Sequence, residues 1–336
     1  MQELKNSLPI SSFSHIYMER EIKNHPNTQK MISHFKNAFV IEIDHYKEVF
    51  CRGHQSFTLQ KQTPKLILAK KKDAFVYQGA EVCEDFGNDR FYYTSSMMNC
   101  IYDCEYCYLQ GMYPSANIVI FVNLEDVFKE VERLLMEGTI YLCISYDTDL
   151  LALEGITSFV ALWTEFARRH PSLKLELRTK SANFKAIENI PPLENFILAW
   201  TLSPSPVASR YEINAPSLEA RLQSARKAME KGWKVRICFD PLLYIKDWRV
   251  DYSRCIEETF RVLPSDKIYD ISIGVFRMAK DYLKKIQKER PHSVLLAYPF
   301  VCDDGVSRYA EKHTKEMVDF VYEKIRAYLP KEKIYR

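Results

Sequence analysis

The sequence lacks the features that mark several large classes of protein. Its 336 residues include only 9 Gly and 15 Pro, so collagen-like and low-complexity chains are excluded. Apolar runs such as residues 196–200 are the length of a strand, far short of the roughly twenty residues that span a membrane. The first residues show no basic stretch followed by an apolar one, so we expect no secretory signal. We therefore expect a cytoplasmic protein with no membrane partner.

An excess of positive charge is also missing. Lys and Arg together number 47 against 44 Asp and Glu, which gives a formal net charge of +3. Domains that bind duplex DNA often have a stronger basic bias, but a near-neutral chain can still present a local basic groove. The charge therefore neither supports nor excludes a nucleic-acid partner. With 47% hydrophobic residues, the chain has enough apolar material for one large domain or two ordinary ones.

The cysteines do not fit a disulfide scaffold, because there are nine of them and no secretory signal. Reduced thiols in a cytosol are the better interpretation. Three are clustered in the segment CIYDCEYC, at Cys100, Cys104 and Cys107. The others are scattered, at Cys51, Cys83, Cys143, Cys238, Cys255 and Cys302.

The first ninety residues predict mixed, irregular structure. Short strands are indicated at residues 39–43, 66–69 and 75–77. The run Lys70-Lys71-Lys72-Asp73 between the last two is typical of a hairpin turn with solvated lysines.

Beyond about residue 91, strands alternate with helices. The expected strands are residues 91–95, 140–145, 173–178, 196–203, 235–240 and 269–276, with an extra short strand at 118–122. The expected helices are residues 124–136, capped by Asn123, 158–169 and 217–231. Six such units predict an α/β fold with a mostly parallel sheet, either doubly wound or closed into a partial (β/α) barrel.

Polar and sulfur side chains follow the predicted strands at one end. The clustered cysteines follow the first strand, and Cys143 and Ser145 end the second. Lys180 follows the third, and Thr201 and Ser203 end the fourth. In a barrel the active site lies at the carboxyl ends of the strands, so we expect these groups to converge on one rim.

The C-x3-C-x2-C spacing of the cluster indicates a metal site. Thiolates are soft ligands that select zinc, copper or iron–sulfur clusters. A structural zinc needs a fourth ligand, and no second Cys or His pair follows nearby. A thioredoxin-like pair of Cys104 and Cys107 would leave Cys100 without a role. Three thiolates can hold three irons of a [4Fe–4S] cluster and leave the fourth open to a small chelating molecule, so the spacing favours that cluster.

The sequence around these cysteines resembles the spore photoproduct lyase family of the radical S-adenosylmethionine superfamily. The resemblance lies in YYTSSMMN at residues 92–99, YLQGMYP at 108–114 and, more loosely, Cys143-Ile144-Ser145 and Arg178-Thr179-Lys180. It implies a partial (β/α)6 TIM-like barrel at residues 91–290, an N-terminal mixed α/β extension at 1–90 and a C-terminal hairpin and helix at 291–336.

The same resemblance implies a DNA repair reaction. In the family, the open iron of a [4Fe–4S] cluster binds S-adenosylmethionine, and an electron from a donor such as flavodoxin or ferredoxin cleaves it. The resulting 5′-deoxyadenosyl radical opens a methylene-bridged thymine dimer, the spore photoproduct, to two thymines. The alternatives are a radical enzyme that acts on another nucleic-acid lesion or on RNA, and a protein with structural zinc.

Roles for single residues also follow from the resemblance. Cys143 matches the hydrogen-atom donor to the product radical, with Cys83 as a weaker candidate. Tyr106 and Tyr108 match tyrosines that return the radical to the cofactor. Cofactor contacts fall on Ser145, Lys180, Thr201 and Ser203. The remaining scattered cysteines are expected to be structural.

DNA contacts are expected in a C-terminal hairpin. Several family members carry a basic, aromatic hairpin that opens the duplex, whereas residues 298–309 here contain one Arg and two Asp. Gly305 suits the turn. Arg308 and Tyr309 are the predicted phosphate contact and wedge in damaged double-stranded DNA.

Overall fold

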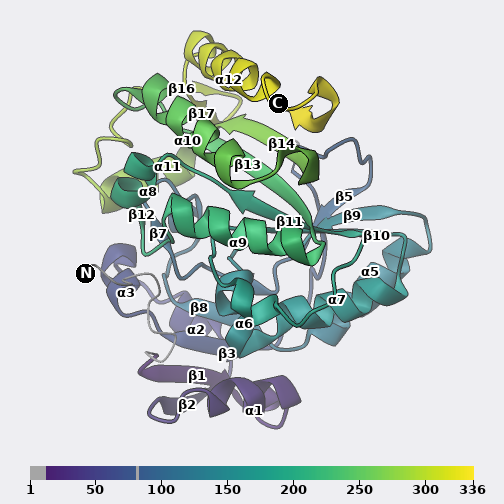
Figure 1. The fold of residues 1–336 in the computed structure, drawn as a ribbon. Helices are drawn as coiled ribbons and strands as arrows, with labels where there is room; N and C mark the ends of the chain where they lie inside the picture. Colours follow the sequence, from purple (N-terminus) through teal and green to yellow (C-terminus); the bar gives the residue numbers. More distant parts are fainter. Residues whose placement is uncertain (1–12, 81–82) are drawn as a thin grey trace, which may run out of the picture.

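The computed structural model describes residues 13–80 and 83–336. Figure 1 shows a smaller N-terminal sheet at the bottom of the view and a larger curved sheet above it, with the C-terminal helix at the top. No helix among these residues is long and apolar enough to cross a membrane.

The N-terminal sheet has five strands in the order β2-β1-β3-β8-β6. They are β1 (His15–Glu19), β2 (Phe39–Ile43), β3 (Leu66–Ala69), β6 (Met97–Met98) and β8 (Ile118–Phe121). Neighbours are parallel except β6 and β8. Strands β3 and β8 are buried over their whole length, which explains their unbroken apolar sequences. The accompanying helices are α1 (Pro26–Ser33), α2 (Lys47–Phe50) and α3 (Phe57–Gln62).

Two expectations for this region are wrong. The strands expected at residues 39–43 and 66–69 are confirmed as β2 and β3, but the region is a regular, mostly parallel sheet instead of an irregular segment. The sheet includes β8, which pairs with β3, and a local pattern cannot reveal that distant partner. The hairpin across residues 70–73 does not form, since β4 (Tyr77–Gln78) pairs with β5 (Phe91–Tyr93) of the other sheet. Lys70 and Lys72 instead form ion pairs with Glu21.

The larger sheet has the order β18-β14-β13-β11-β10-β9-β5-β4. The strands are β5 (Phe91–Tyr93), β9 (Ile140–Cys143), β10 (Leu173–Thr179), β11 (Phe196–Thr201), β13 (Lys234–Leu242), β14 (Ile268–Val275) and β18 (Ile334–Tyr335). From β5 to β14 the six strands are parallel and follow chain order without the reversal of a doubly wound sheet. This order confirms the partial (β/α)6 barrel.

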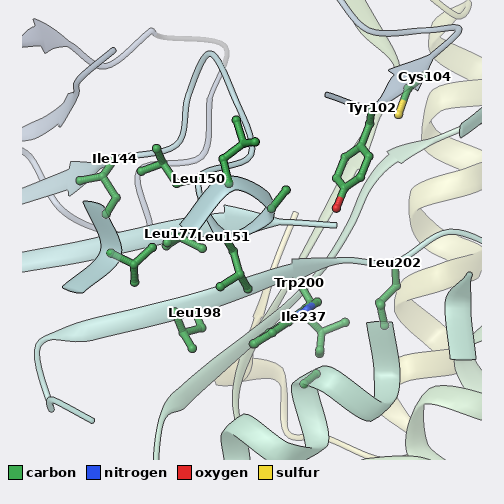
Figure 2. Packing of buried hydrophobic residues seen from close by; sticks show 14 of the residues in the cluster. Tyr102, Cys104, Ile144, Leu150, Leu151, Leu177, Leu198, Trp200, Leu202 and Ile237 are labelled. Carbon is green, nitrogen blue, oxygen red and sulfur yellow. The ribbon is translucent and has the colours of Figure 1, made fainter. Parts of the chain in front are cut away.

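Alternation along the strands separates the two faces of this sheet. On β10, Leu175 and Leu177 belong to the main apolar core, whereas Glu176 and Arg178 take the opposite face. Figure 2 shows Leu177, Leu198 and Ile237 in that apolar layer, from three different strands. The other face is polar and forms the inside of the half-barrel.

Helices cover the outer face of the sheet, and three of them, at residues 124–135, 159–169 and 218–231, lie where the apolar periodicity predicts them. They are α5 (Leu124–Leu135), α6 (Glu154–Thr157), α7 (Phe159–Arg169), α8 (Ser205–Tyr211), α9 (Leu218–Lys231) and α10 (Trp248–Val262). Asn123 precedes α5 but makes no capping bond to the helix backbone. Asn123 is the N-cap residue of α5, as expected, but its side chain bonds to the main chain of Lys71 and to Asp126 and does not cap the helix.

The C-terminal residues form a hairpin and a helix against the end of the barrel. Strand β15 (Arg277–Ala279) leads into α11 (Lys280–Glu289), and β16 (Val301–Asp303) and β17 (Val306–Arg308) form the hairpin. Asp304 and Gly305 make its turn with positive φ angles of 46° and 73°. Helix α12 (Glu311–Arg326) follows and contacts β14, and β18 then adds to that strand.

Candidate active site

The cysteine loop runs from β6 to α4 (Leu109–Met112) and is held firmly at its start. Asn99 has a φ of 67° and donates from Nδ2 to the carbonyl oxygens of Ser115 at 2.7 Å and Asn117 at 2.8 Å. The buried Lys61 of α3 donates from Nζ to the carbonyl oxygens of Cys100 and Tyr102. These bonds fix the main chain that carries the first cysteine.

A second set of bonds fixes the middle of the loop. Cys104 lies in β7 (Asp103–Cys104), which pairs antiparallel with β12 (Glu212–Ile213). The Nε2 of Gln110 donates to the carbonyl oxygen of Cys104 at 2.7 Å. Arg290, after α11, bonds to both Gln110 and Asp103. The C-terminal half of the chain therefore holds the loop in place.

The three thiols fit an iron–sulfur cluster by their chemistry. Burial raises the pKa of Cys100 to about 12 and raises the pKa of Cys104 and Cys107. The thiols also raise one another's pKa, so they lie near one another. Across residues 13–80 and 83–336, no three His, Cys, Asp or Glu side chains already stand in metal-binding positions. A cluster bound there would take the three cysteines as thiolates, so its binding would release their protons.

Glu212 joins several of the predicted site residues. It is buried and accepts hydrogen bonds from the hydroxyls of Tyr106 and Ser203, the latter at 2.8 Å. The Nζ of Lys180 lies 3.9 Å from its carboxylate and 5.4 Å from the centre of the Tyr106 ring. Residues from three distant segments thus meet at one carboxylate beside Cys104.

Arg221 balances the charge of Glu212. Its side chain is fully buried, pairs with the carboxylate through Nη2 and donates from Nη1 to the carbonyl oxygen of Thr201 at 3.2 Å. Burial opposes ionisation of Glu212, but the charges of Arg221 and Lys180 outweigh it and lower its pKa to about 2. Sequence reasoning missed both Glu212 and Arg221, because no spacing links them to their partners.

Asp149 is a further residue that the sequence did not reveal. It is buried and accepts from the hydroxyl of Thr179 at 2.7 Å and from the backbone N–H of Lys180 at 2.7 Å. These bonds fix the backbone after β10, from which the Lys180 side chain reaches Glu212. Asp149 is thus a positioning group for a predicted cofactor contact.

Cys143 and Ser145 lie farther along the rim, at the end of β9. The hydroxyl of Ser145 donates to the carbonyl oxygen of Arg178 at 2.9 Å and accepts from its N–H at 2.7 Å. Cys143 is buried on the inner face, and burial with the nearby Glu176 charge raises its pKa to about 12 despite Arg178. The side chain therefore stays a neutral thiol that keeps its S–H hydrogen.

Charged side chains border this thiol. The carboxylate of Asp240 lies 3.5 Å from Arg178 Nη1 and 3.2 Å from Arg277 Nη1. Gly274 leaves room for that carboxylate, since a Cβ there would stand 2.5 Å from Asp240 Oδ1. Glu176 also pairs with Arg178, at 3.1 Å from its Nε, so two arginines and two carboxylates balance one another on the inner rim beside Cys143.

The two predicted relay tyrosines have different partners. The hydroxyl of Tyr106 is directed at Glu212, whereas that of Tyr108 donates to the carbonyl oxygen of Tyr146 at 2.7 Å. Tyr146 follows Cys143 by three residues, so Tyr108 connects the cysteine loop with the end of β9. The weaker donor candidate also lies here, since the Sγ of Cys83 is 3.5 Å from the hydroxyl oxygen of Tyr146.

The two residues predicted to contact DNA differ in their exposure to solvent. Arg308 is exposed on the hairpin and pairs with Asp303 of the same hairpin. Tyr309 is fully buried among aromatic rings, and its hydroxyl accepts from the N–H of Tyr244 at 3.0 Å. A wedge must reach the duplex, so the wedge expectation for Tyr309 is wrong. The Tyr309 ring instead packs against the segment that leads into the hairpin.

A partial (β/α)6 barrel with a three-cysteine loop after its first strand defines a protein of the radical S-adenosylmethionine class. The model of one family of that class, described as spore photoproduct lyase, matches residues 13–335. The chain therefore belongs to the spore photoproduct lyase family, as its cysteine segment predicted.

Individual relatives are distant in sequence. A spore photoproduct lyase of Clostridium acetobutylicum is 22% identical over 84% of both chains. One of Geobacillus sp. (strain Y412MC61) is 22% identical over 58% of this chain, and the match spans 59% of the relative's own length.

Solved structures share the fold over nearly the whole chain. A spore photoproduct lyase complexed with dinucleoside spore photoproduct matches with a TM-score of 0.84 at 18% identity, over 97% of this chain and 98% of that one. A doubly substituted variant with bound S-adenosylmethionine and dinucleoside spore photoproduct matches with a TM-score of 0.81 at 20% identity, over 98% of both.

Proposed function

We propose that this protein repairs the spore photoproduct in DNA, the methylene-bridged thymine dimer, and returns it to two thymines. The observation that carries the proposal is the position of a neutral, buried thiol, Cys143, on the inner face of a barrel whose rim also holds the three-cysteine loop. Membership of the spore photoproduct lyase family agrees with this arrangement.

Cys100, Cys104 and Cys107 would hold three irons of a [4Fe–4S] cluster. When bound, the cluster and S-adenosylmethionine supply one-electron chemistry that yields a 5′-deoxyadenosyl radical. Lys180, placed by Asp149 and Glu212, offers a positive charge to an anionic group of the cofactor. We propose Ser145, Thr201 and Ser203 as further cofactor contacts, because they lie at neighbouring strand ends on the same rim.

Cys143 is the proposed hydrogen donor to the product radical. Its raised pKa keeps the hydrogen on sulfur at neutral pH. Tyr106 and Tyr108 are the proposed route by which the radical returns to the cofactor. The guanidinium groups of Arg178 and Arg277 are the hydrogen-bond donors of this rim that suit a substrate with carbonyl oxygens and phosphates.

We propose duplex DNA and a small electron carrier, flavodoxin or ferredoxin, as partners. Arg308 is the proposed phosphate contact, because it is the exposed cation of the hairpin's second strand. We place the reaction in the cytoplasm, since all nine cysteines are free in the structure and reduced thiols persist there.

The decisive experiment is anaerobic reconstitution with iron, sulfide and S-adenosylmethionine, followed by an assay on a duplex with one spore photoproduct. Wild-type protein should restore two thymines and leave undamaged duplex unchanged. Activity on RNA or on another lesion alone would favour a different radical enzyme. Stoichiometric zinc in colourless protein would contradict the proposal.

Cys143→Ala tests the donor role in the same assay. Cofactor cleavage should persist, while repair to thymine falls and abnormal thymine adducts form. Cys238→Ala is the matched control, because it removes a buried thiol from β13 of the same sheet. If Cys143→Ala repairs DNA with clean thymine product, the donor is another thiol, and Cys83 is the next to test.

A further inference from the structure

Three tyrosines form a stack beside the proposed donor thiol. The ring of Tyr146 stacks on Tyr93, with centroids 4.1 Å apart and planes 23° apart. Tyr93 stacks in turn on Tyr77, with centroids 5.0 Å apart and planes 14° apart. The rings come from β4, β5 and the loop after β9, so three segments of the chain build the stack. Such packing holds the Tyr146 ring in a defined orientation.

The hydroxyl at the inner end of this stack contacts a thiol. The Oη of Tyr146 is 3.5 Å from the Sγ of Cys83, within hydrogen-bonding distance for sulfur. Cys83 also interacts electrostatically with Cys143, so the two thiols lie in the same part of the site. The contact therefore pairs an O–H group with a thiol close to the proposed hydrogen donor.

Tyr146 also contacts the segment that carries the cysteine loop. Its carbonyl oxygen accepts from the hydroxyl of Tyr108, and the two rings have centroids 6.1 Å apart. Tyr108 directly follows Cys107. Tyr146 thus stands between the thiols of the barrel and the proposed return route of the radical.

We propose that Tyr146 exchanges a hydrogen atom reversibly with Cys83 and is a third redox-active tyrosine of this enzyme. The proposal rests on the proposed function, which leaves a thiyl radical on Cys143 when the substrate-derived radical takes its hydrogen. That radical takes the hydrogen atom of the nearby Cys83, so the S–H bond of Cys143 forms again and the thiyl radical moves to Cys83. In the exchange, the O–H bond of Tyr146 breaks and the S–H bond of Cys83 forms. One proton and one electron move together from oxygen to sulfur. The thiyl radical is reduced to a thiol, and Tyr146 is oxidised to a phenoxyl radical.

If this exchange takes place, Tyr146 protects the thiols of the site from irreversible oxidation. A thiyl radical that persists in the site is open to attack by oxygen and to loss on the oxidation pathway of cysteine. A phenoxyl radical on Tyr146, packed in the tyrosine stack, is better protected from oxygen than the thiyl radical. The reverse transfer, from Cys83 to Tyr146, restores the tyrosine. Loss of the Tyr146 hydroxyl should therefore increase oxidation of Cys83.

The test uses the full-length protein without cluster, so that it does not depend on repair activity. Azide radicals generated by pulse radiolysis oxidise tyrosine, a nitrone traps thiyl radicals, and peptide mass spectrometry locates the adducts. Wild-type protein should give an adduct on Cys83. Tyr146→Phe should lower that adduct several-fold and leave the circular dichroism spectrum unchanged. Tyr77→Phe is the matched control, since it removes a hydroxyl from the far end of the same stack.

Two outcomes would overturn the proposal. One is equal trapping on Cys83 in wild-type protein and Tyr146→Phe, and the other is an equal loss in Tyr77→Phe. Failure of the proposed function is seen separately, as wild-type protein that carries a cluster and cleaves S-adenosylmethionine but does not repair the lesion. A second measurement uses the active enzyme. The amount of oxidised Cys83 per turnover should be several-fold higher in Tyr146→Phe than in Tyr77→Phe.

Discussion

Replacement of Glu212 by Gln should destabilise the fold far more than removal of an ordinary salt bridge. The substitution keeps the shape of the side chain but removes its charge. Arg221, whose side chain is fully buried, would then lose its carboxylate partner, and Lys180 would lose its nearest carboxylate. The new amide has one accepting oxygen in place of two, so its NH2 would take the place either of the oxygen that accepts from the hydroxyls of Tyr106 and Ser203 or of the oxygen that accepts from Arg221. Buried donors without acceptors are costly.

The expected loss follows from the burial of the pair. Removing one partner of a buried ion pair costs about 3–5 kcal/mol, which raises the unfolding equilibrium constant by roughly two to four powers of ten. Glu230→Gln is the matched control, because Glu230 forms an exposed pair with Arg226 on α9 at 2.9 Å. An exposed pair of this kind contributes less than about 1 kcal/mol.

Denaturant unfolding of the metal-free protein, followed by circular dichroism, measures both variants. Combining Glu212→Gln with Arg221→Met should recover part of the loss, because an apolar side chain needs no partner in the buried site. The reasoning is refuted if Glu212→Gln and Glu230→Gln lower the free energy of unfolding equally.

Four further changes have defined outcomes. Cys104→Ala should abolish the brown colour and the iron content of anaerobically purified protein, whereas metal analysis that finds iron retained would remove Cys104 from the ligand set. Arg308→Ala should weaken duplex binding and reduce the slope of log K against log salt by about 1; unchanged titrations would place the DNA surface elsewhere. Glu154 has a pKa raised to about 7 by burial. Its contribution to stability is therefore present below its ordinary pKa and is lost as pH rises through about 7, so Glu154→Gln should flatten the dependence of the unfolding free energy between those values. Gly111→Ala should destabilise the protein by about 1–3 kcal/mol, because its Cβ would stand 2.4 Å from backbone of α11; Gly155→Ala, with open space around it, should not.

Local sequence patterns predicted the elements of the barrel and its cysteine loop. Apolar periodicity placed α5, α7 and α9 within a residue or two, because their buried stripes recur every three or four residues. The strands were predicted with similar accuracy, although β5, β9 and β11 end about two residues earlier than expected. The residues after those ends, among them Ser145 and Ser203, leave the sheet and form the rim.

Pairing between distant segments could not be predicted. The sheet at the N-terminus depends on β8, and the hairpin expected at residues 70–73 fails because β4 pairs with β5. The burial of the Tyr309 side chain could not be predicted either, because it depends on distant segments of the chain. The resemblance to a hairpin that opens the duplex suggested an exposed wedge, but Tyr309 is fully buried against aromatic rings from other segments.

The sequence by itself determined the chemistry of the candidate site, since the spacing of Cys100, Cys104 and Cys107 lies within one short loop. Only the tertiary structure decided which groups support that loop. Glu212 lies in β12, Lys180 follows β10 and Arg221 belongs to α9, so only the packed chain brings them together. The contact of Cys83 with Tyr146 also joins residues from separate segments. The spacing of three cysteines is local, so it can be read from the sequence. A buried ion pair, or a contact between a tyrosine hydroxyl and a thiol, exists only when the packed chain places the two partners side by side.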